Sequence, residues 1–74
     1  MYIVLELQRN GDQAANLVTT FDNYNEAKSK YYLVLSAAAI SSVEYHSAFL
    51  LSDEDGYLSH ETFIHRNDEP PAEE

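Results

Sequence analysis

The histidines are the residues of this sequence best suited to metal or acid-base chemistry. His46 and His60 fall on the two C-terminal apolar segments, which we expect to pair as strands. A regular register would place them diagonally on one face, followed there by Glu44. Two imidazoles and a carboxylate could hold zinc. The spacing matches no known zinc motif, and His65 falls on the other face, so we expect no metal site.

The sequence offers little else for catalysis. It has no cysteine to serve as a nucleophile or thiolate ligand, and its two glycines form no phosphate-binding loop. No pair of carboxylates stands on regular elements beside a basic group, and serine, histidine and aspartate are not brought together by their spacing. We therefore expect a protein that is not an enzyme and takes no cofactor.

The charge of the chain limits its partners. The 74 residues carry 13 acidic and 4 basic side chains, for a net charge of −9. Phosphate binding requires clustered lysine and arginine, so we expect no direct nucleic-acid binding. The acidic turn "SDEDG" and the tyrosine after it offer both charge and an aromatic anchor for a basic partner protein. The predicted partner-binding residues are Asp53, Glu54, Asp55 and Tyr57.

Residues 1–66 are predicted to form a single α+β domain. Alternating or β-branched segments predict strands at 2–9, 17–21, 43–51 and 57–65, and Asn10-Gly11 is a strong hairpin signal. Asn23 and Glu26 resemble a capping box, which predicts a helix over about 24–41. The order β-β-α-β-β indicates a four-stranded antiparallel sheet with the helix packed across one face. The segment "NDEPPAEE", residues 67–74, is predicted to be a disordered acidic tail.

The helix has more apolar surface than one sheet can cover. One stripe, residues 24, 27, 31, 34, 35 and 38, follows the spacing of a buried face. A second apolar set predicts a homo-oligomer interface, formed by Tyr32, Leu33, Ala37 and Ile40.

The strands support self-association because both of their faces carry apolar residues. In the first strand, Ile3, Leu5 and Leu7 share one face, as in a half-buried strand, whereas Glu6 and Gln8 lie on the other. The second faces of the strands, which we expect the helix to leave uncovered, are also apolar; they include Tyr2, Val4, Val18, Leu50, Leu58 and Ile64.

The sequence also bears on location. No apolar run approaches the roughly 20 residues of a membrane span, and the N-terminal segment lacks the basic region of a secretion signal. The absence of cysteine fits a reducing compartment. We therefore expect a cytoplasmic protein without membrane association.

The segments "MYIVLELQ", "NLVTTFDNYNEAKSKYYLVLSAAAIS" and "HSAFLLSDEDGYL" resemble a group of short uncharacterised proteins of prophages and mobile elements in gut Firmicutes. The resemblance spans residues 1–65 and implies no reaction. It implies a phage accessory protein, in the host cytoplasm, that binds and inhibits a host protein, such as an anti-CRISPR acting on a defence effector. Two alternatives stay open: an oligomeric protein that sequesters a small signalling molecule, and a minor phage structural or assembly protein.

Overall fold

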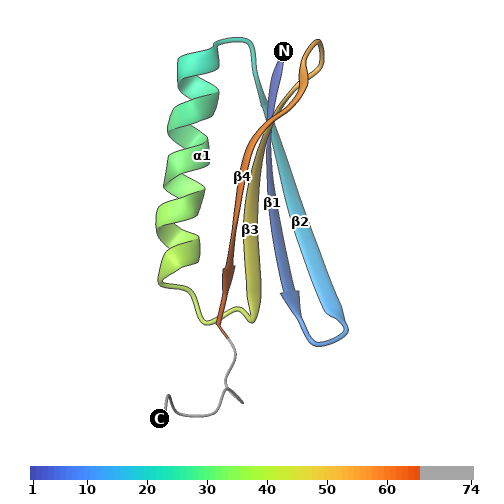
Figure 1. The fold of residues 1–74 in the computed structure, drawn as a ribbon, viewed down its shortest axis with the longest axis vertical. Coiled ribbons are helices and arrows are strands. Elements are labelled where there is room, and N and C mark those ends of the chain that lie inside the picture. Colours follow the sequence, from blue (N-terminus) through green and yellow to red (C-terminus); the bar gives the residue numbers. More distant parts are fainter. Residues whose placement is uncertain (66–74) are drawn as a thin grey trace.

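The computed structural model describes residues 1–65 of the chain, so the predicted tail lies outside the described residues. The elements follow the predicted order β-β-α-β-β. The four strands form one sheet, and the helix lies beside it (Figure 1). The bounds are β1 (Tyr2–Asn10), β2 (Gln13–Phe21), α1 (Tyr24–Ala39), β3 (Tyr45–Ser52) and β4 (Gly56–Ile64).

The sheet is antiparallel throughout, with the strand order β2-β1-β3-β4. Two hairpins therefore lie side by side, joined at the centre by β1 and β3. The helix packs across one face of the sheet (Figure 1). These features confirm the predicted α+β architecture. Among residues 1–65, no element covers the opposite face, which we call the open face.

The first hairpin is longer than predicted, because β2 begins at Gln13 rather than near residue 17. Asn10 pairs with Gln13, and Gly11 between them adopts a left-handed φ of 56° that favours glycine. The Asn10 side chain also accepts a hydrogen bond from the Glu44 backbone at 2.8 Å. In return, the Glu44 carboxylate accepts one from the Gly11 backbone at 3.0 Å. These two bonds fix the hairpin against the segment that enters β3.

The helix begins where its capping signal predicts. Asn23 is extended, and its side-chain oxygen accepts a hydrogen bond from the Glu26 backbone N–H at 3.1 Å. The helix ends at Ala39, two residues before the predicted end. Its last turn tightens there, because the Ile40 and Ser41 amides donate to carbonyls three residues back.

The core lies between α1 and the two central strands. Helix residues 27, 31 and 34 pack there against buried side chains of β1 and β3, namely Val4, Ala48 and Leu50. This arrangement corrects the predicted faces. Val4 and Leu50 were expected on the uncovered side, together with Tyr2, but both lie under the helix and Tyr2 packs against them. Residues 3, 5 and 7 therefore face away from the helix.

The helix cap yields a first prediction. Asn23→Ala removes the acceptor of the Glu26 amide and should cost about 1 kcal/mol of the free energy of unfolding. For a domain of this size, that loss lowers the melting temperature by about 4–8 °C in a calorimetric scan. Asn25→Ala, at an exposed position in the first turn of the helix, is the matched control and should leave the melting temperature unchanged. Equal effects of the two variants would contradict the capping role.

Candidate interaction surface

The two candidate metal-binding histidines lie on opposite faces of the sheet. The regular strand register expected from the sequence would pair His46 with Thr62 and Ala48 with His60. A register irregularity beside Leu50 and Leu51 shifts the strands, so His46 pairs with Phe63, and Phe49 with His60. A bulge of this kind moves every later residue to the other face. The prediction that the two histidines share one face of the sheet was therefore wrong. Among residues 1–65, no three histidine, aspartate or glutamate residues form a group that could hold a metal ion.

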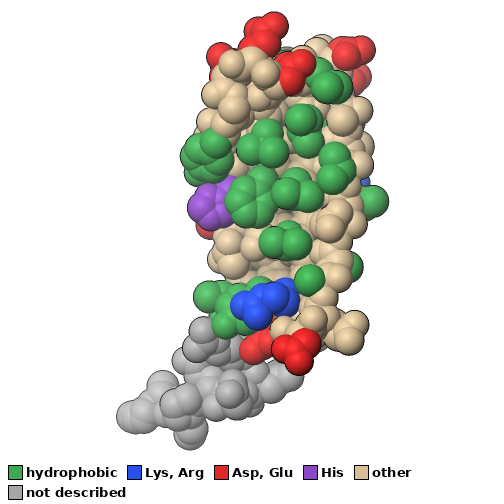
Figure 2. All heavy atoms as spheres, turned by 90° about the vertical axis from the view of Figure 1, so that its right-hand side faces the viewer, with side chains coloured by type: hydrophobic (Ala, Val, Ile, Leu, Met, Phe, Trp, Pro, Cys, Tyr) green, Lys and Arg blue, Asp and Glu red, His purple; other side chains and the backbone are tan. Residues whose placement is uncertain are grey.

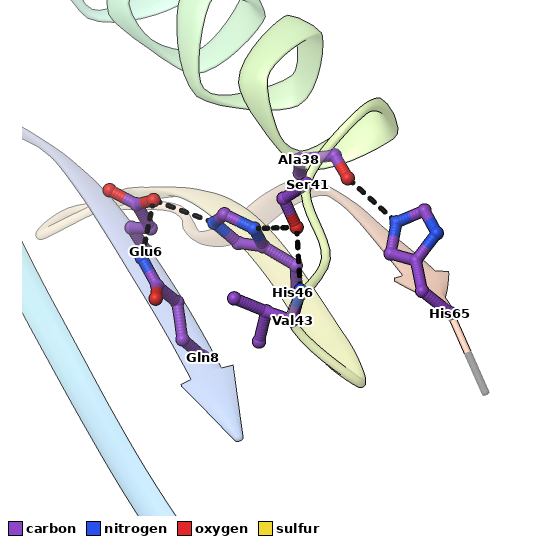
Figure 3. A network of polar contacts seen from close by, with 7 residues as sticks. All are labelled: Glu6, Gln8, Ala38, Ser41, Val43, His46 and His65. Carbon is purple, nitrogen blue, oxygen red and sulfur yellow. Dashed lines mark hydrogen bonds and ion pairs between the residues drawn. The ribbon is translucent and has the colours of Figure 1, made fainter. Parts of the chain in front are cut away.

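His46 is instead part of a buried polar network under the end of the helix (Figure 3). Its Nε2 lies 2.6 Å from Oε2 of Glu6, and its Nδ1 lies 2.9 Å from Oγ of Ser41. The same Glu6 oxygen accepts a hydrogen bond from the Gln8 amide at 3.1 Å. An ionised carboxylate only accepts, so a neutral His46 ring donates to Glu6 and accepts from Ser41. The network joins β1, β3 and the loop after α1.

The order serine, histidine, glutamate resembles a charge-relay arrangement, but its surroundings favour a structural role. Ser41 also accepts a hydrogen bond from the Val43 backbone at 3.3 Å, which holds its hydroxyl within the loop. The His46 side chain is only 5 % exposed. We interpret this network as a link between the helix end and the sheet. Sequence reasoning missed it; the only signal was two polar residues, Glu6 and Gln8, on the face that also carries Val4.

The open face is the main apolar surface of the described chain. Figure 2 shows hydrophobic side chains gathered over its middle, with acidic side chains at both ends and a basic side chain beside those at the lower end. Strand alternation places these residues opposite the core. The half-buried members come from the central strands and are Ile3, Leu5, Leu7, Phe49 and Leu51; the exposed members come from the outer strands and are Val18, Tyr57 and Ile64.

Three aromatic side chains are already ordered on the open face. The rings of Phe49 and His60 stack with centroids 5.0 Å apart and planes 9° from parallel. The Tyr57 hydroxyl lies 3.2 Å from Nδ1 of His60, and the Tyr57 side chain remains 60 % exposed. A partner that contacts this group meets side chains whose rotamers are partly fixed, so less conformational entropy is lost on binding.

The predicted partner-binding residues adjoin this aromatic group. Asp53, Glu54 and Asp55 form the exposed turn between β3 and β4, and Tyr57 is the second residue of β4. The Ser52 hydroxyl fixes the turn by accepting hydrogen bonds from the backbone of residues 54 and 55. Asp53 contacts the Met1 amino group at 3.0 Å. This hydrogen bond raises the pKa of the Met1 amino group above its ordinary value of 8.0, and nearby acidic side chains add to the rise.

The predicted oligomer interface lies on the solvent side of α1. Tyr32, Leu33, Ala37 and Ile40 are all exposed, with Ile40 at 88 %. The helix stripe packed on the sheet agrees with the prediction except at Tyr24, which is 41 % exposed and contacts the ring of Tyr2. The chain thus carries apolar side chains on two opposite sides. Association through the helix stays a prediction.

Two small hollows lie on the β1–β2 hairpin of the described chain, and each has a volume of about 160 Å³. Sites for small organic ligands usually measure roughly 300–1,000 Å³. This difference does not favour sequestration of a small molecule by a single copy of the chain. No helix within residues 1–65 has the length and apolar character needed to cross a membrane.

Comparison with known proteins gives no match: no family model, no curated protein and no solved structure corresponds to this chain. The resemblance to prophage proteins therefore stays a prediction.

The buried network yields a second prediction. Glu6→Ala leaves the His46 ring and the Gln8 amide without their acceptor, which should lower the free energy of unfolding by about 1–3 kcal/mol in urea denaturation. The control is Glu61→Ala, which removes an exposed carboxylate from β4 and should change it by less than about 0.5 kcal/mol. A loss no larger at Glu6 than at Glu61 would show that the network contributes nothing to stability.

Proposed function

We propose that this chain is a non-catalytic binding protein that acts by occupying the surface of a partner protein with its open face. The supporting observation is the open face itself, where apolar residues of all four strands lie side by side. With strands about 4.8 Å apart and about 3.3 Å per residue, this face measures on the order of 500 Å² in projection. A face of this size with an apolar middle is large enough to serve as an interaction site.

The charges around the open face suggest what the partner offers. Acidic side chains lie at both ends of the apolar surface (Figure 2). The turn at residues 53–55 supplies those beside Tyr57, whereas the opposite end also carries Arg9, which lies over the Tyr45 ring. A complementary partner has an apolar patch with basic residues at its rim. Rim charges mainly speed association, whereas a buried aromatic anchor slows dissociation. The net charge of −9 disfavours nucleic acid as the direct partner.

The resemblance to prophage proteins supplies a biological setting for this proposal. In that setting the partner is a host protein, the effect is inhibition, and the site of action is the host cytoplasm. A nucleic-acid-binding defence effector would present the required basic rim around its own binding site. The inhibitor would then act stoichiometrically, by covering the surface that the effector needs.

Self-association through the outer side of α1 yields the third prediction. Wild-type protein should show at least the dimer mass by light scattering at micromolar concentration. Ile40→Glu places a charge within the proposed interface and should reduce the mass to that of one chain, with the circular dichroism unchanged. Ile64→Glu adds the same charge to the open face and should remain oligomeric. Dissociation by Ile64→Glu instead would move the interface to the sheet.

Binding through the open face yields the fourth prediction. Immobilised protein should retain one host protein in stoichiometric amount from a lysate of a gut Firmicutes host. Tyr57→Ala removes the exposed anchor and should shorten the lifetime of the complex by about tenfold in surface plasmon resonance. Tyr24→Ala, on the helix side of the sheet, is the matched control and should leave the lifetime unchanged.

Two results would contradict the prediction of binding through the open face. Equal lifetimes for the two tyrosine variants would place the partner elsewhere on the molecule. Inactivation of a large excess of partner by a trace of this protein would mean turnover, and the non-catalytic proposal would fail.

A further inference from the structure

The outer edge of β2 lacks the features that normally block strand addition. Its nine residues, Gln13–Phe21, include no charged residue and no proline. Each pairs with β1 in an unbroken register, so no bulge turns the edge away. Natural edge strands are usually protected by charges, proline or bulges. The other outer strand, β4, has both the charged residue Glu61 and the irregular register beside Leu50 and Leu51.

A carboxylate lies beside this edge on the helix side of the sheet. Glu6 pairs with Leu17 of β2, and the two residues line one of the hollows, together with Gln8, Ala15 and Asn16. Both hydrogen bonds that Glu6 accepts from described residues end on Oε2. Figure 3 shows the second oxygen directed away from His46, on the side of β2. The Glu6 side chain is 17 % exposed, so this oxygen belongs to a partly desolvated acid.

We propose that the edge of β2 accepts an extended segment of the partner protein as an additional antiparallel strand, anchored by an arginine or lysine that reaches Glu6. The added strand would lie about 10 Å from β1. Its residue opposite Ala15 would point to the helix side, and a long basic stem could lie over the alanine methyl toward the carboxylate. Main-chain hydrogen bonds would supply affinity and the basic side chain specificity.

The charges at the ends of β2 argue against a second copy as the occupant. Asp12 precedes the strand and Asp22 follows it. Antiparallel pairing of two copies about Leu17 would place Asp12 of one copy opposite Asp22 of the other, and like charges in such positions repel. A partner segment with an uncharged centre and basic residues at its two ends would complement the acidic residues at both ends of β2. This inference rests on the proposed function, because it assumes that the partner is a protein.

A synthetic peptide, acetyl-KTVTVTVRVTK-amide, provides the probe. In the antiparallel register its arginine lies opposite Ala15 and its terminal lysines lie near Asp12 and Asp22. We expect it to bind the full chain and to slow hydrogen exchange at the backbone amides of β2, as measured by NMR. Replacing the arginine by neutral citrulline should weaken binding about tenfold, because the lost bond is charge-assisted.

Two neighbouring alanines provide matched variants. Ala15→Lys adds a like charge beside the arginine and should weaken the arginine peptide about tenfold relative to the citrulline peptide. Ala14→Lys adds the same charge to the same strand but on the open face, and should preserve the preference for arginine. Both alanines are exposed, so neither change removes core packing. Glu6→Gln should abolish the preference for the arginine peptide over the citrulline peptide. If Glu6→Gln unfolds the protein, the comparison of Ala15→Lys with Ala14→Lys still tests the proposal.

Other outcomes would overturn the inference. Equal affinity of the two peptides for wild-type protein would exclude the Glu6 anchor, and absence of binding would exclude strand addition. Protection confined to Leu5 and Phe49 would place the peptide on the open face, which contradicts this inference while leaving the proposed function intact. Protection of β2 that rises with protein concentration, without peptide, would identify a second copy. Failure of the Tyr57→Ala prediction would count against the open face and not against the edge.

Discussion

The close approach of one helix to two central strands determines the rest of this structure. Ala27, Ala38 and Ala48 have no exposed surface. Their short side chains let the helix backbone lie near the sheet, where Val4 and Leu50 are buried beside them. A single helix covers a single face, however. The open face follows from this one-sided packing, whereas the outer position of β2 follows from the strand order.

The interface between helix and sheet changes character along its length. Aliphatic contacts occupy the middle, whereas the C-terminal end is polar: His46 bridges Glu6 and Ser41, and His65 donates from Nε2 to the carbonyl of Ala38 at 2.8 Å. The last carbonyls of a helix need such partners. This polar end also accounts for the face that β1 presents to the helix. Glu6 can be covered because His46 and Gln8 satisfy it, and the more apolar face of β1, with Ile3, Leu5 and Leu7, is left outside.

Local signals in the sequence were sufficient for the elements and their order. Asn10-Gly11 and the cap at Asn23 are short-range features, and each forms the turn or helix start that it predicts. Local signals could not show which face of β1 turns toward the helix. That choice depends on a contact between Glu6 and His46, which are far apart in the chain. The prediction that His46 and His60 share a face was wrong for a similar reason. Leu58 has no partner in the register and shifts the pairing of the residues after it, and no residue type at this point of the sequence indicates a bulge.

The candidate surface was predictable only in part. Exposure of Tyr57 and of the acidic turn followed from their polar surroundings, and exposure of Ile40 followed from the helical wheel. The residues at the centre of the open face were expected to lie in the core, since alternating apolar residues normally mark a buried face. A small domain with a single covering layer breaks that rule, because it has more apolar faces than layers to cover them.

The strand order also sets the sequence in which the chain can acquire its structure. Each hairpin joins strands that are neighbours in sequence, whereas the β1–β3 pairing brings Val4 opposite Leu50, a separation of 50 − 4 = 46 residues. Closing so long a loop costs more entropy than closing a hairpin turn. The hairpins and helix can form early, and the central seam forms last. During synthesis, β1 must therefore wait for β3 to leave the ribosome, and the apolar side chains of its two faces stay uncovered in the meantime.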